Sequence, residues 1–365
     1  MVDSNIAAAT LHIDLDALVE NWRLIGQRAA PAVASAVVKA DAYGLGAVPV
    51  ARALADAGCR HFFVAHLCET LPLEQVLPPD ARLYVLNGLM PGAEAVCAAT
   101  RAIPVLNSTD QIERWAAQAR VSGRRLPALL QVDTGMSRMG LSPRELDRLV
   151  AAPRRLDGVE LLYVISHLAC ADDPESPANT AQAMRFEQVS RHFPDLPRAL
   201  DNSAGALGPR PGHFDLVRPG IALYGGAPHN DAPNPMRRVV GLEARIVQLR
   251  TIPAGTGVGY GLTFTAQRES VIATIGVGYA DGWPWQLGNR GAAFIGGRRV
   301  PIVGRVSMDS ITIDVTDIPE QQLYPGAPVE LLGSHQSVDD VARDAGTISY
   351  EILTRLGDRY ARVYH

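Results

Sequence analysis

Between residues 11 and 225, short apolar runs alternate with stretches typical of helices, at a spacing of some tens of residues. The runs are rich in Val, Ile, Leu and Ala without strict alternation of apolar and polar residues, which is typical of parallel strands buried on both faces. Eight strands are expected, over residues 34–39, 61–64, 83–86, 103–106, 128–132, 161–166, 199–202 and 214–217. This number, and the lack of a Gly-x-Gly-x-x-Gly turn after the first strand, favours an N-terminal (β/α)8 barrel of the TIM type over a doubly wound sheet.

Two sequence signals mark where helices of this barrel begin. Ser142-Pro143-Arg144-Glu145 has the form of a capping box with proline at the first helical position. Ser108 and the glutamine three residues later form a weaker version of the same signal. Both signals follow expected strands, so they predict the helix of a strand–helix repeat.

The composition changes after the last expected barrel strand. Residues 225–235 are rich in Gly, Pro and Asn, which is typical of a linker. Short β-type runs follow at 243–249, 271–277, 299–302 and 311–315, and the tail 339–360 has a helical or mixed pattern. We therefore expect a barrel over residues 11–235 and a C-terminal β-rich domain over residues 236–365, with residues 1–10 as candidates for packing against the second domain.

The charge balance argues against two classes of partner. The net charge is −4 and the pI is about 6.1, whereas nucleic acids and anionic membranes attract a basic surface. No stretch approaches the ~20 apolar residues of a membrane-spanning helix, and the first arginine, Arg23, comes too late for a basic leader. The cysteines form no C-x-x-C pair, so neither a zinc site nor a disulfide framework is expected. These features predict a cytoplasmic protein that acts on a small molecule.

The chain has 34 Lys and Arg residues, and only one of them, Lys39, is a lysine. Arginine replaces lysine at little cost where only surface charge is needed, because exposed ion pairs contribute about 0–1 kcal/mol. A lysine, unlike an arginine, can lose its proton and form a Schiff base with a carbonyl group. Lys39 also closes an expected strand, at the catalytic face of a barrel. Its position alone leaves two interpretations open, a covalent catalyst or a chance survivor on an exposed loop.

Glycine-rich segments at the expected strand ends provide candidate phosphate-binding groups. The segment after Lys39 contains two glycines and Tyr43, whose hydroxyl can donate a hydrogen bond to a phosphate. Residues 202–205 follow the seventh strand and Gly220-Ile221 follow the eighth, where barrels often bind phosphate. Each segment taken alone is equally consistent with a simple turn.

Eight sequence motifs are distributed over nearly the whole chain. They are KADAYGLG at 39–46, VDTGMSRMG at 132–140, SHLACADD at 166–173, RPGIALYG at 218–225, GYGLTF at 259–264, GYADGWP at 278–284, GRVSMD at 304–309 and SYEILTRLGDRYARVY at 349–364. In this order they resemble the alanine racemase family. The resemblance implies a fold-type III enzyme that uses pyridoxal 5′-phosphate (PLP), a barrel followed by a β domain, and a homodimer whose active sites lie at the subunit interface. The implied reaction interconverts L-alanine and D-alanine, either to supply D-alanine for peptidoglycan or to degrade it.

The resemblance also implies roles for individual residues. Lys39 would hold PLP covalently and act as one base, and Tyr260 of the partner subunit would act as the other, because racemisation removes a proton on one face and returns it on the opposite face. A tyrosine with its usual pKa of about 10 is a poor base at neutral pH, so His167 and Arg218 would support it. Arg218 would also face the pyridine nitrogen and, because it keeps its proton, leave that nitrogen unprotonated.

The remaining implied residues bind the cofactor or the substrate. The phosphate would be bound by Tyr43, Ser203, Gly220, Ile221 and Tyr350. The substrate carboxylate would be bound by Arg138 and by the backbone N–H of Met308 from the partner subunit. Substrate access would be lined by Tyr279 and Tyr350. A zinc site built from His167 and the adjacent acids is discounted for want of further ligands, so no metal is expected.

One position departs from the family pattern. Gln131 stands where the family often has a lysine whose carbamate holds the carboxylate-binding arginine, and glutamine has no amine to carbamylate. A chloride, a water or the glutamine amide is left to orient Arg138. Three alternatives stay open beside alanine racemase: a broad-specificity racemase of small amino acids with the same fold, a fold-type III decarboxylase, and a catalytically silent PLP-binding protein.

Overall fold

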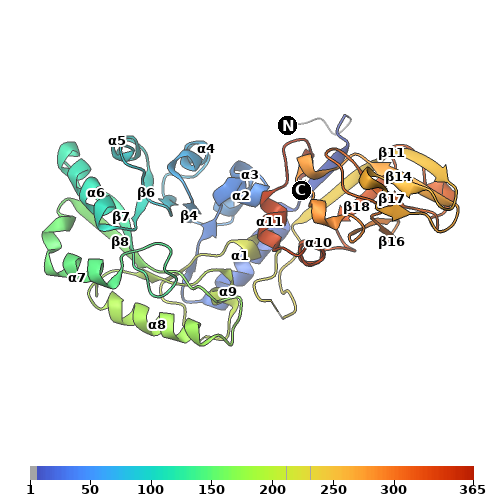
Figure 1. Ribbon diagram of the computed structural model, residues 1–365. Coiled ribbons are helices and arrows are strands. Elements are labelled where there is room, and N and C mark those ends of the chain that lie inside the picture. The colour runs from blue at the N-terminus through green and yellow to red at the C-terminus, as the bar shows by residue number, and fades with distance from the viewer. Residues whose placement is uncertain (1–5, 211, 231) are drawn as a thin grey trace. The chain divides into compact units, whose positions relative to one another are not determined.

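The computed structural model describes residues 6–210, 212–230 and 232–365, and the chain divides into two compact units (Figure 1). The barrel unit consists of Val19–Leu223 and Ala227–Met236. The β unit consists of the residues up to Leu18, Tyr224–Gly226 and Arg237–His365. Among the helices that the structure describes, none is long and apolar enough to cross a membrane.

The barrel unit is built on parallel strands. Seven of them form one sheet in the order β3-β4-β5-β6-β7-β8-β9, so each strand pairs with the next along the chain. Two further strands, β2 and β10, pair with each other in parallel. The bounds are β2 (Val33–Ala34), β3 (Ala36–Val37), β4 (His61–Val64), β5 (Arg82–Val85), β6 (Ala102–Leu106), β7 (Leu126–Gln131), β8 (Val159–Ile165), β9 (Arg198–Ala199) and β10 (Leu216–Val217).

Hydrogen bonds on both sides of β10 close the sheet into a ring. Ser35 N donates to Val217 O over 3.0 Å on one side, and Arg218 N donates to Asp201 O over 2.8 Å on the other. The expected first strand, 34–39, is divided, because β2 pairs with β10 whereas β3 pairs with β4. The chain thus changes partner at Ser35 and completes the barrel. The predicted fold class, a (β/α)8 barrel with a C-terminal β-rich part, is confirmed.

Helices follow the strands and run along the outside of the sheet (Figure 1). α7 begins as the sequence predicts, because Ser142 Oγ accepts the Glu145 N–H and the Glu145 carboxylate accepts the Ser142 N–H over 2.9 Å. Ser108 likewise caps α6 by accepting the Gln111 N–H over 3.2 Å. The α-helices before residue 223 are α1 (Leu15–Ala29), α2 (Lys39–Gly44), α3 (Ala47–Asp56), α4 (Thr70–Glu74), α5 (Glu94–Ala98), α6 (Thr109–Ser122), α7 (Pro143–Ala151), α8 (Pro177–Ser190) and α9 (Ser203–Leu207).

The β unit contains an eight-stranded sheet and a separate two-stranded hairpin. The main path runs β16-β15-β18-β11-β1-β19, and β14 joins it by pairing with both β11 and β17. The hairpin pairs β12 with β13. The bounds are β1 (Ala9–Ile13), β11 (Val240–Ile252), β12 (Gly257–Val258), β13 (Phe264–Thr265), β14 (Ser270–Ile275), β15 (Ala292–Ile295), β16 (Arg298–Pro301), β17 (Ile311–Asp314), β18 (Pro328–Leu332) and β19 (Ala361–Tyr364).

The long strand β11 organises this sheet. Its first part pairs with β1 and β18, and its second part pairs with β14. A register shift between Ile246 and Gln248 marks the change of partner, as expected of a bulge that bends a long strand. β1 lies between β11 and β19, antiparallel to the first and parallel to the second. The first described strand of the chain therefore belongs to the same sheet as the last.

The tail contains two helices, α10 (Val338–Ala345) and α11 (Ser349–Thr354), followed by β19. Ser337 caps α10, since its Oγ accepts the Asp340 N–H over 3.1 Å. The helical or mixed tail expected from the sequence is present. The strand β19 follows this tail, and the apolar pattern does not indicate it.

A partly buried polar cluster in the barrel unit is sensitive to acid. His61 Nδ1 and the Tyr84 hydroxyl lie 2.9 Å apart, and the Tyr163 ring meets the His61 ring edge-on at 6.1 Å. Burial, with a smaller contribution from Arg82, lowers the pKa of His61 to about 4. An unfolded histidine has a pKa of about 6.5. On acidification, the unfolded chain therefore takes up a proton at His61 before the folded chain does.

We expect the free energy of unfolding to fall as the pH drops from about 6.5, because the unfolded state then binds more protons than the folded state. Above this pH the imidazole is neutral in both states and adds no slope. His61→Phe should flatten the pH dependence, which urea unfolding at a series of pH values measures. His192→Asn, a change at an exposed histidine, is the control and should keep the wild-type slope. Equal slopes for His61→Phe and wild type would contradict this account.

Candidate active site

The sequence-predicted residues of the barrel unit gather at one rim, where its parallel strands end. They follow five different strands: Lys39 and Tyr43 come after β3, Arg138 after β7, His167 after β8, Ser203 after β9, and Arg218, Gly220 and Ile221 after β10. Parallel barrel strands all end on the same side, so residues distant in the sequence converge there. The expectation that Lys39 lies at the carboxyl end of the first strand agrees with its place in the structure.

Lys39 begins a turn with an unusual backbone. The next four residues, from Ala40 to Tyr43, have φ between 52° and 56°, which is the left-handed region. None of them is glycine, and a left-handed residue with a side chain costs roughly 1–2 kcal/mol. Ala42 N donates to Val38 O over 3.0 Å, which closes the turn on the end of the strand. Backbone strain of this kind persists only where the surroundings enforce it, and it is concentrated at functional sites.

The Lys39 amine is half-buried and lies near other cationic groups. Burial lowers the pKa of Lys39, Arg138 lowers it further, and Glu69 opposes the shift. A lowered pKa increases the fraction of neutral amine at neutral pH. The neutral amine is the form that attacks a carbonyl carbon.

Arg218 and His167 lie side by side at this rim. Arg218 is only 4% exposed, and its Nη2 donates to Ser166 O and, over 3.2 Å, to Leu200 O. The same nitrogen lies 3.4 Å from His167 Nδ1. An arginine can only donate, so Nδ1 accepts and the proton of the neutral ring lies on Nε2. Burial, reinforced by the charge of Arg218, lowers the pKa of His167 to about 3, so the ring is neutral at physiological pH.

The other terminal nitrogen of Arg218 is available to a ligand. Nη1 is buried and has no hydrogen-bond partner among the residues that the structure describes. A buried donor left unpaired costs free energy, so this nitrogen suits an acceptor that is not part of the chain. Burial lowers the pKa of Arg218 to about 10, which still leaves the guanidinium charged at neutral pH.

Two hydroxyl groups lie beside the backbone at Gly220. Ser203 Oγ accepts the Gly220 N–H over 2.9 Å and the Ala222 N–H over 3.3 Å, which leaves its own proton for donation. A Cβ atom at Gly220 would overlap the Tyr43 hydroxyl, so glycine is required for this approach. Ile221 is buried next to them and begins a short 3-10 helix. A hydroxyl group with a proton left to donate, beside a second hydroxyl group, suits an anionic ligand such as phosphate.

A tight loop after β7 carries Arg138. The Asp133 carboxylate accepts three successive N–H groups, those of residues 135–137, over 2.9 to 3.1 Å. Leu141 N donates to Gln131 O over 2.9 Å and joins the two ends of the loop. Gln131 is buried at the end of β7 and carries no charge. The anchor of the Arg138 loop is therefore the Asp133 carboxylate.

The other four candidates lie in the β unit. Tyr260 begins a short 3-10 helix and is 71% exposed, and Met308 is 52% exposed. Tyr279 and Met308 are neighbours, since Ala280 N donates to Met308 O over 2.9 Å. Tyr350 lies on α11. Two of the four, Tyr279 and Met308, are thus brought together within this unit.

A charge cluster connects the loops that carry Tyr279 and Met308. Arg359 donates to both carboxylate oxygens of Asp281, over 2.6 and 2.8 Å, and to Asp309 over 2.7 Å. Asp281 is buried two residues after Tyr279, and Asp309 directly follows Met308. Arg359 therefore fixes the two loops relative to each other.

Two acidic residues at the barrel rim are absent from the sequence-based prediction. Glu69 accepts the Ala40 N–H over 2.6 Å. Asp201 is fully buried, accepts Arg210 Nη2 over 2.5 Å and lies 3.1 Å from His213 Nδ1. Glu69 comes a few residues after an expected strand and Asp201 falls within one, and an acidic residue at such a position is too common a signal to select a site residue.

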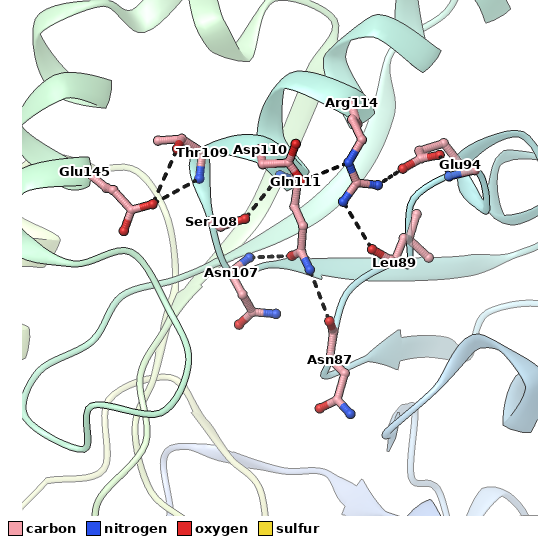
Figure 2. Close-up of polar contacts among 11 residues, drawn as sticks. Asn87, Leu89, Glu94, Asn107, Ser108, Thr109, Asp110, Gln111, Arg114 and Glu145 are labelled. Carbon is pink, nitrogen blue, oxygen red and sulfur yellow. Dashed lines mark hydrogen bonds and ion pairs between the residues drawn. The ribbon is translucent and has the colours of Figure 1, made fainter.

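A polar network, shown in Figure 2, supports the rim beyond β5 and β6. Gln111 Oε1 accepts the Asn107 N–H over 2.8 Å, and Gln111 Nε2 donates to Asn87 O over 3.2 Å. Arg114, one turn further along α6, binds Glu94. These contacts fasten α6 to two strand ends and include none of the predicted catalytic residues.

Comparison with known proteins identifies the family. The N-terminal domain of alanine racemase matches residues 13–228, and the C-terminal domain of alanine racemase matches residues 239–364. The chain belongs to the alanine racemase family. An Agrobacterium fabrum protein named catabolic alanine racemase is 52% identical over 358 residues, which cover 98% of this chain and 92% of that protein. A Brucella ovis alanine racemase is 53% identical over 371 residues, which cover 98% of this chain and 94% of that protein.

A solved structure shows the same likeness. The crystal structure of alanine racemase from Bartonella henselae has a TM-score of 0.94 and 45% sequence identity, and the match covers 98% of this chain and all of that one. It contains covalently bound pyridoxal phosphate, in agreement with the cofactor expected from the sequence. The resemblance to alanine racemases, a family of isomerases, is thereby confirmed. Within the described part of the chain, no group of three or more His, Cys, Asp or Glu side chains is placed to hold a metal ion.

Proposed function

We propose that this protein is a PLP-dependent enzyme that interconverts L-alanine and D-alanine. One observation carries the proposal. Lys39, the single lysine of the chain, lies at the same barrel rim as Arg218, a buried arginine whose Nη1 has no hydrogen-bond partner among the described residues. The names of the two relatives, which align over 98% of the chain, support it. The proposal concerns the reaction, and it covers both supply of D-alanine for peptidoglycan and degradation of D-alanine.

The residues at the rim fit PLP. Lys39 would hold its carbonyl carbon covalently, and Arg218 Nη1 would donate to its pyridine nitrogen. Its phosphate would be bound by Tyr43, Ser203, Gly220, Ile221 and Tyr350. When bound, PLP withdraws electrons from the substrate Cα and makes the proton on that carbon acidic.

Arg218 sets the charge at the pyridine nitrogen. With a pKa of about 10, the guanidinium keeps its proton at neutral pH and donates a hydrogen bond without transferring the proton. With PLP bound, Arg218 would leave the ring nitrogen unprotonated and so reduce its electron-withdrawing power. This arrangement would favour return of the proton to Cα over transamination or decarboxylation.

Two bases on opposite faces of the substrate would exchange the Cα proton. Lys39 serves one face, and Tyr260 of the partner subunit serves the other. The high exposure of Tyr260 and Met308 is expected of residues that complete the site of another subunit. Leu262 and Trp285 are exposed apolar residues of the same unit, and their burial would stabilise a homodimer. Arg138 and the backbone N–H of Met308 bind the substrate carboxylate, and Tyr279 and Tyr350 line its access.

His167 supports the tyrosine base. Arg218 donates to Nδ1, so the neutral ring carries its proton on Nε2 and can donate it in a hydrogen bond to a phenolate. A donor stabilises the deprotonated form of the phenol. The chain from Arg218 through His167 to Tyr260 of the partner subunit thus favours a basic oxygen at neutral pH.

Two measurements on the purified, PLP-loaded protein test the proposal. L-alanine and D-alanine should be interconverted, as followed by polarimetry, faster than serine and other small amino acids and without release of carbon dioxide. Borohydride reduction followed by peptide mass mapping should place the pyridoxyl label on Lys39. Comparable rates on many amino acids would favour a broad-specificity racemase, carbon dioxide release would favour a decarboxylase, and bound PLP without turnover would indicate a silent binding protein.

A methyl group at Gly220 should weaken PLP binding by about ten- to a hundredfold, because overpacking at a fixed backbone costs about 1–3 kcal/mol. The added Cβ would overlap the Tyr43 hydroxyl and push it away from the phosphate. Titration of the full-length protein with PLP, followed by absorbance, measures the effect in Gly220→Ala. Gly26→Ala is the matched control, since its Cβ would make an ordinary 3.6 Å contact with Ala34. Unchanged affinity in Gly220→Ala would argue against a phosphate site there.

A further inference from the structure

We propose that Glu69 is a positioning residue for Lys39. Its carboxylate holds the left-handed turn that directs the Lys39 side chain, and it supplies a negative charge close to the start of that turn. The inference deepens the proposed function and rests on it, because it concerns how the covalent lysine is held ready for PLP.

The Glu69 carboxylate joins the Lys39 turn to the neighbouring strand. Glu69 ends a short 3-10 helix, Leu67–Glu69, which follows β4. Its Oε1 accepts the Ala40 N–H over 2.6 Å. Its Oε2 accepts the Ala65 N–H over 2.7 Å and the His66 N–H over 2.8 Å. Both oxygens are thus engaged, and three backbone amides from two strand ends meet on one side chain.

The hydrogen bond from the Ala40 N–H is the one that affects Lys39. Ala40 directly follows Lys39 and is the first residue of the left-handed turn. Its orientation determines how the chain leaves Lys39, and a hydrogen bond to a charged acceptor is stronger than one to a neutral acceptor. The turn ends at Tyr43, whose hydroxyl lies beside Gly220. A change at Glu69 should therefore reach both the covalent lysine and the phosphate site, although Glu69 touches neither.

The charge of Glu69 acts on the Lys39 amine as well. Two cationic or titratable groups reach Lys39 from other loops, Arg138 after β7 and His167 after β8. His167 is neutral, and Arg138 and burial both lower the pKa of Lys39, whereas Glu69 raises it. Loss of the Glu69 charge would leave Arg138 unopposed and lower the pKa of Lys39 further.

Competitive amine labelling of the full-length protein freed of PLP tests both effects. Because Lys39 is the only lysine, the labelled ε-amine reports on one residue, and peptide mapping separates it from the α-amine. Glu69→Gln keeps the size of the side chain but replaces one of the two accepting oxygens with an NH2 group, which cannot accept an N–H. In this variant the labelling midpoint should move to lower pH, because the charge that raises the pKa of Lys39 is lost. The dissociation constant of PLP should rise by about tenfold.

Two further variants test whether the effect comes from the charge of Glu69, from the length of its side chain, or from the loss of any nearby acidic residue. Glu69→Asp keeps the charge on a shorter side chain, so its midpoint should lie closer to wild type than that of Glu69→Gln, while its PLP affinity falls. Glu74→Gln removes an equal charge one helix further on, where Glu74 accepts the Arg101 N–H over 3.0 Å, and it should leave both readouts unchanged.

Three results would overturn the inference: a wild-type midpoint and affinity in Glu69→Gln, an equal midpoint shift in Glu69→Asp and Glu69→Gln, or an equal effect of Glu74→Gln. Each is distinct from failure of the proposed function, which would appear as a wild-type protein that binds PLP without racemising alanine. The labelling experiment needs no turnover and gives its answer in either case.

Discussion

Lys39→Arg is expected to lower kcat for alanine racemisation by roughly 10⁴-fold or more. The substitution keeps a positive charge next to Glu69 and Arg138, so the local charge is preserved. A guanidinium cannot form the covalent bond to PLP, and it cannot accept the Cα proton at neutral pH. The rate of conversion of L-alanine to D-alanine and the borohydride-stable adduct measure the two losses separately.

Arg144→Lys is the control for this experiment. It introduces a second lysine at an exposed position of α7, which should neither take up PLP nor change the rate. An added small amine should restore part of the activity of Lys39→Ala, because it can replace the missing base. Full activity in Lys39→Arg, or a pyridoxyl label on another residue of the wild type, would exclude Lys39 as the covalent base.

Tyr260→Phe is expected to lower kcat by about 10²- to 10⁴-fold, since it removes one of two acid–base groups and keeps the ring. A site that combines Lys39 of one subunit with Tyr260 of the other allows a more specific test. Co-expression of Lys39→Ala chains with Tyr260→Phe chains yields hybrid dimers in which one site has both intact residues. Random pairing makes half of the dimers hybrids, so activity should recover to about a quarter of wild type.

Tyr324→Phe serves as the control, because Tyr324 is another exposed tyrosine of the β unit and should tolerate the loss of its hydroxyl. Each inactive variant expressed alone should stay inactive. If hybrid dimers are shown to form but racemase activity does not recover, Lys39 and Tyr260 do not act across a subunit interface.

The barrel could be predicted because its signals are local. Apolar runs such as 161–166 have the length and composition of buried strands, and the Ser142 capping box satisfies helix amides within one turn. The β unit was harder to predict. β1 pairs with β11 and β19, which come from distant parts of the sequence, and no local pattern encodes that choice of partners.

In the candidate site, too, some features could be predicted from the sequence and others could not. Lys39 could be selected because a single lysine is a property of the composition. Arg218 and His167 could be selected because they belong to motifs, and Ser203 because its segment follows an expected strand. The left-handed turn after Lys39 could not be predicted, because its residues Ala40 and Ala42 have side chains that normally avoid this conformation. Glu69 could not be predicted for a related reason. Its carboxylate binds backbone N–H groups, and the residue types in the sequence do not indicate which backbone groups a side chain binds.

The place of β1 between β11 and β19 has a consequence for biosynthesis. Strand β1 begins at Ala9, and its parallel partner β19 covers Ala361–Tyr364. During synthesis β1 therefore emerges from the ribosome long before β19 is available to pair with it. Pairing over so great a sequence separation is slow, and an unpaired strand edge is exposed to association with other chains while it waits. A chain that lacks residues 361–365 should thus lose one neighbour of β1 and aggregate during synthesis, although none of the candidate active-site residues has been removed.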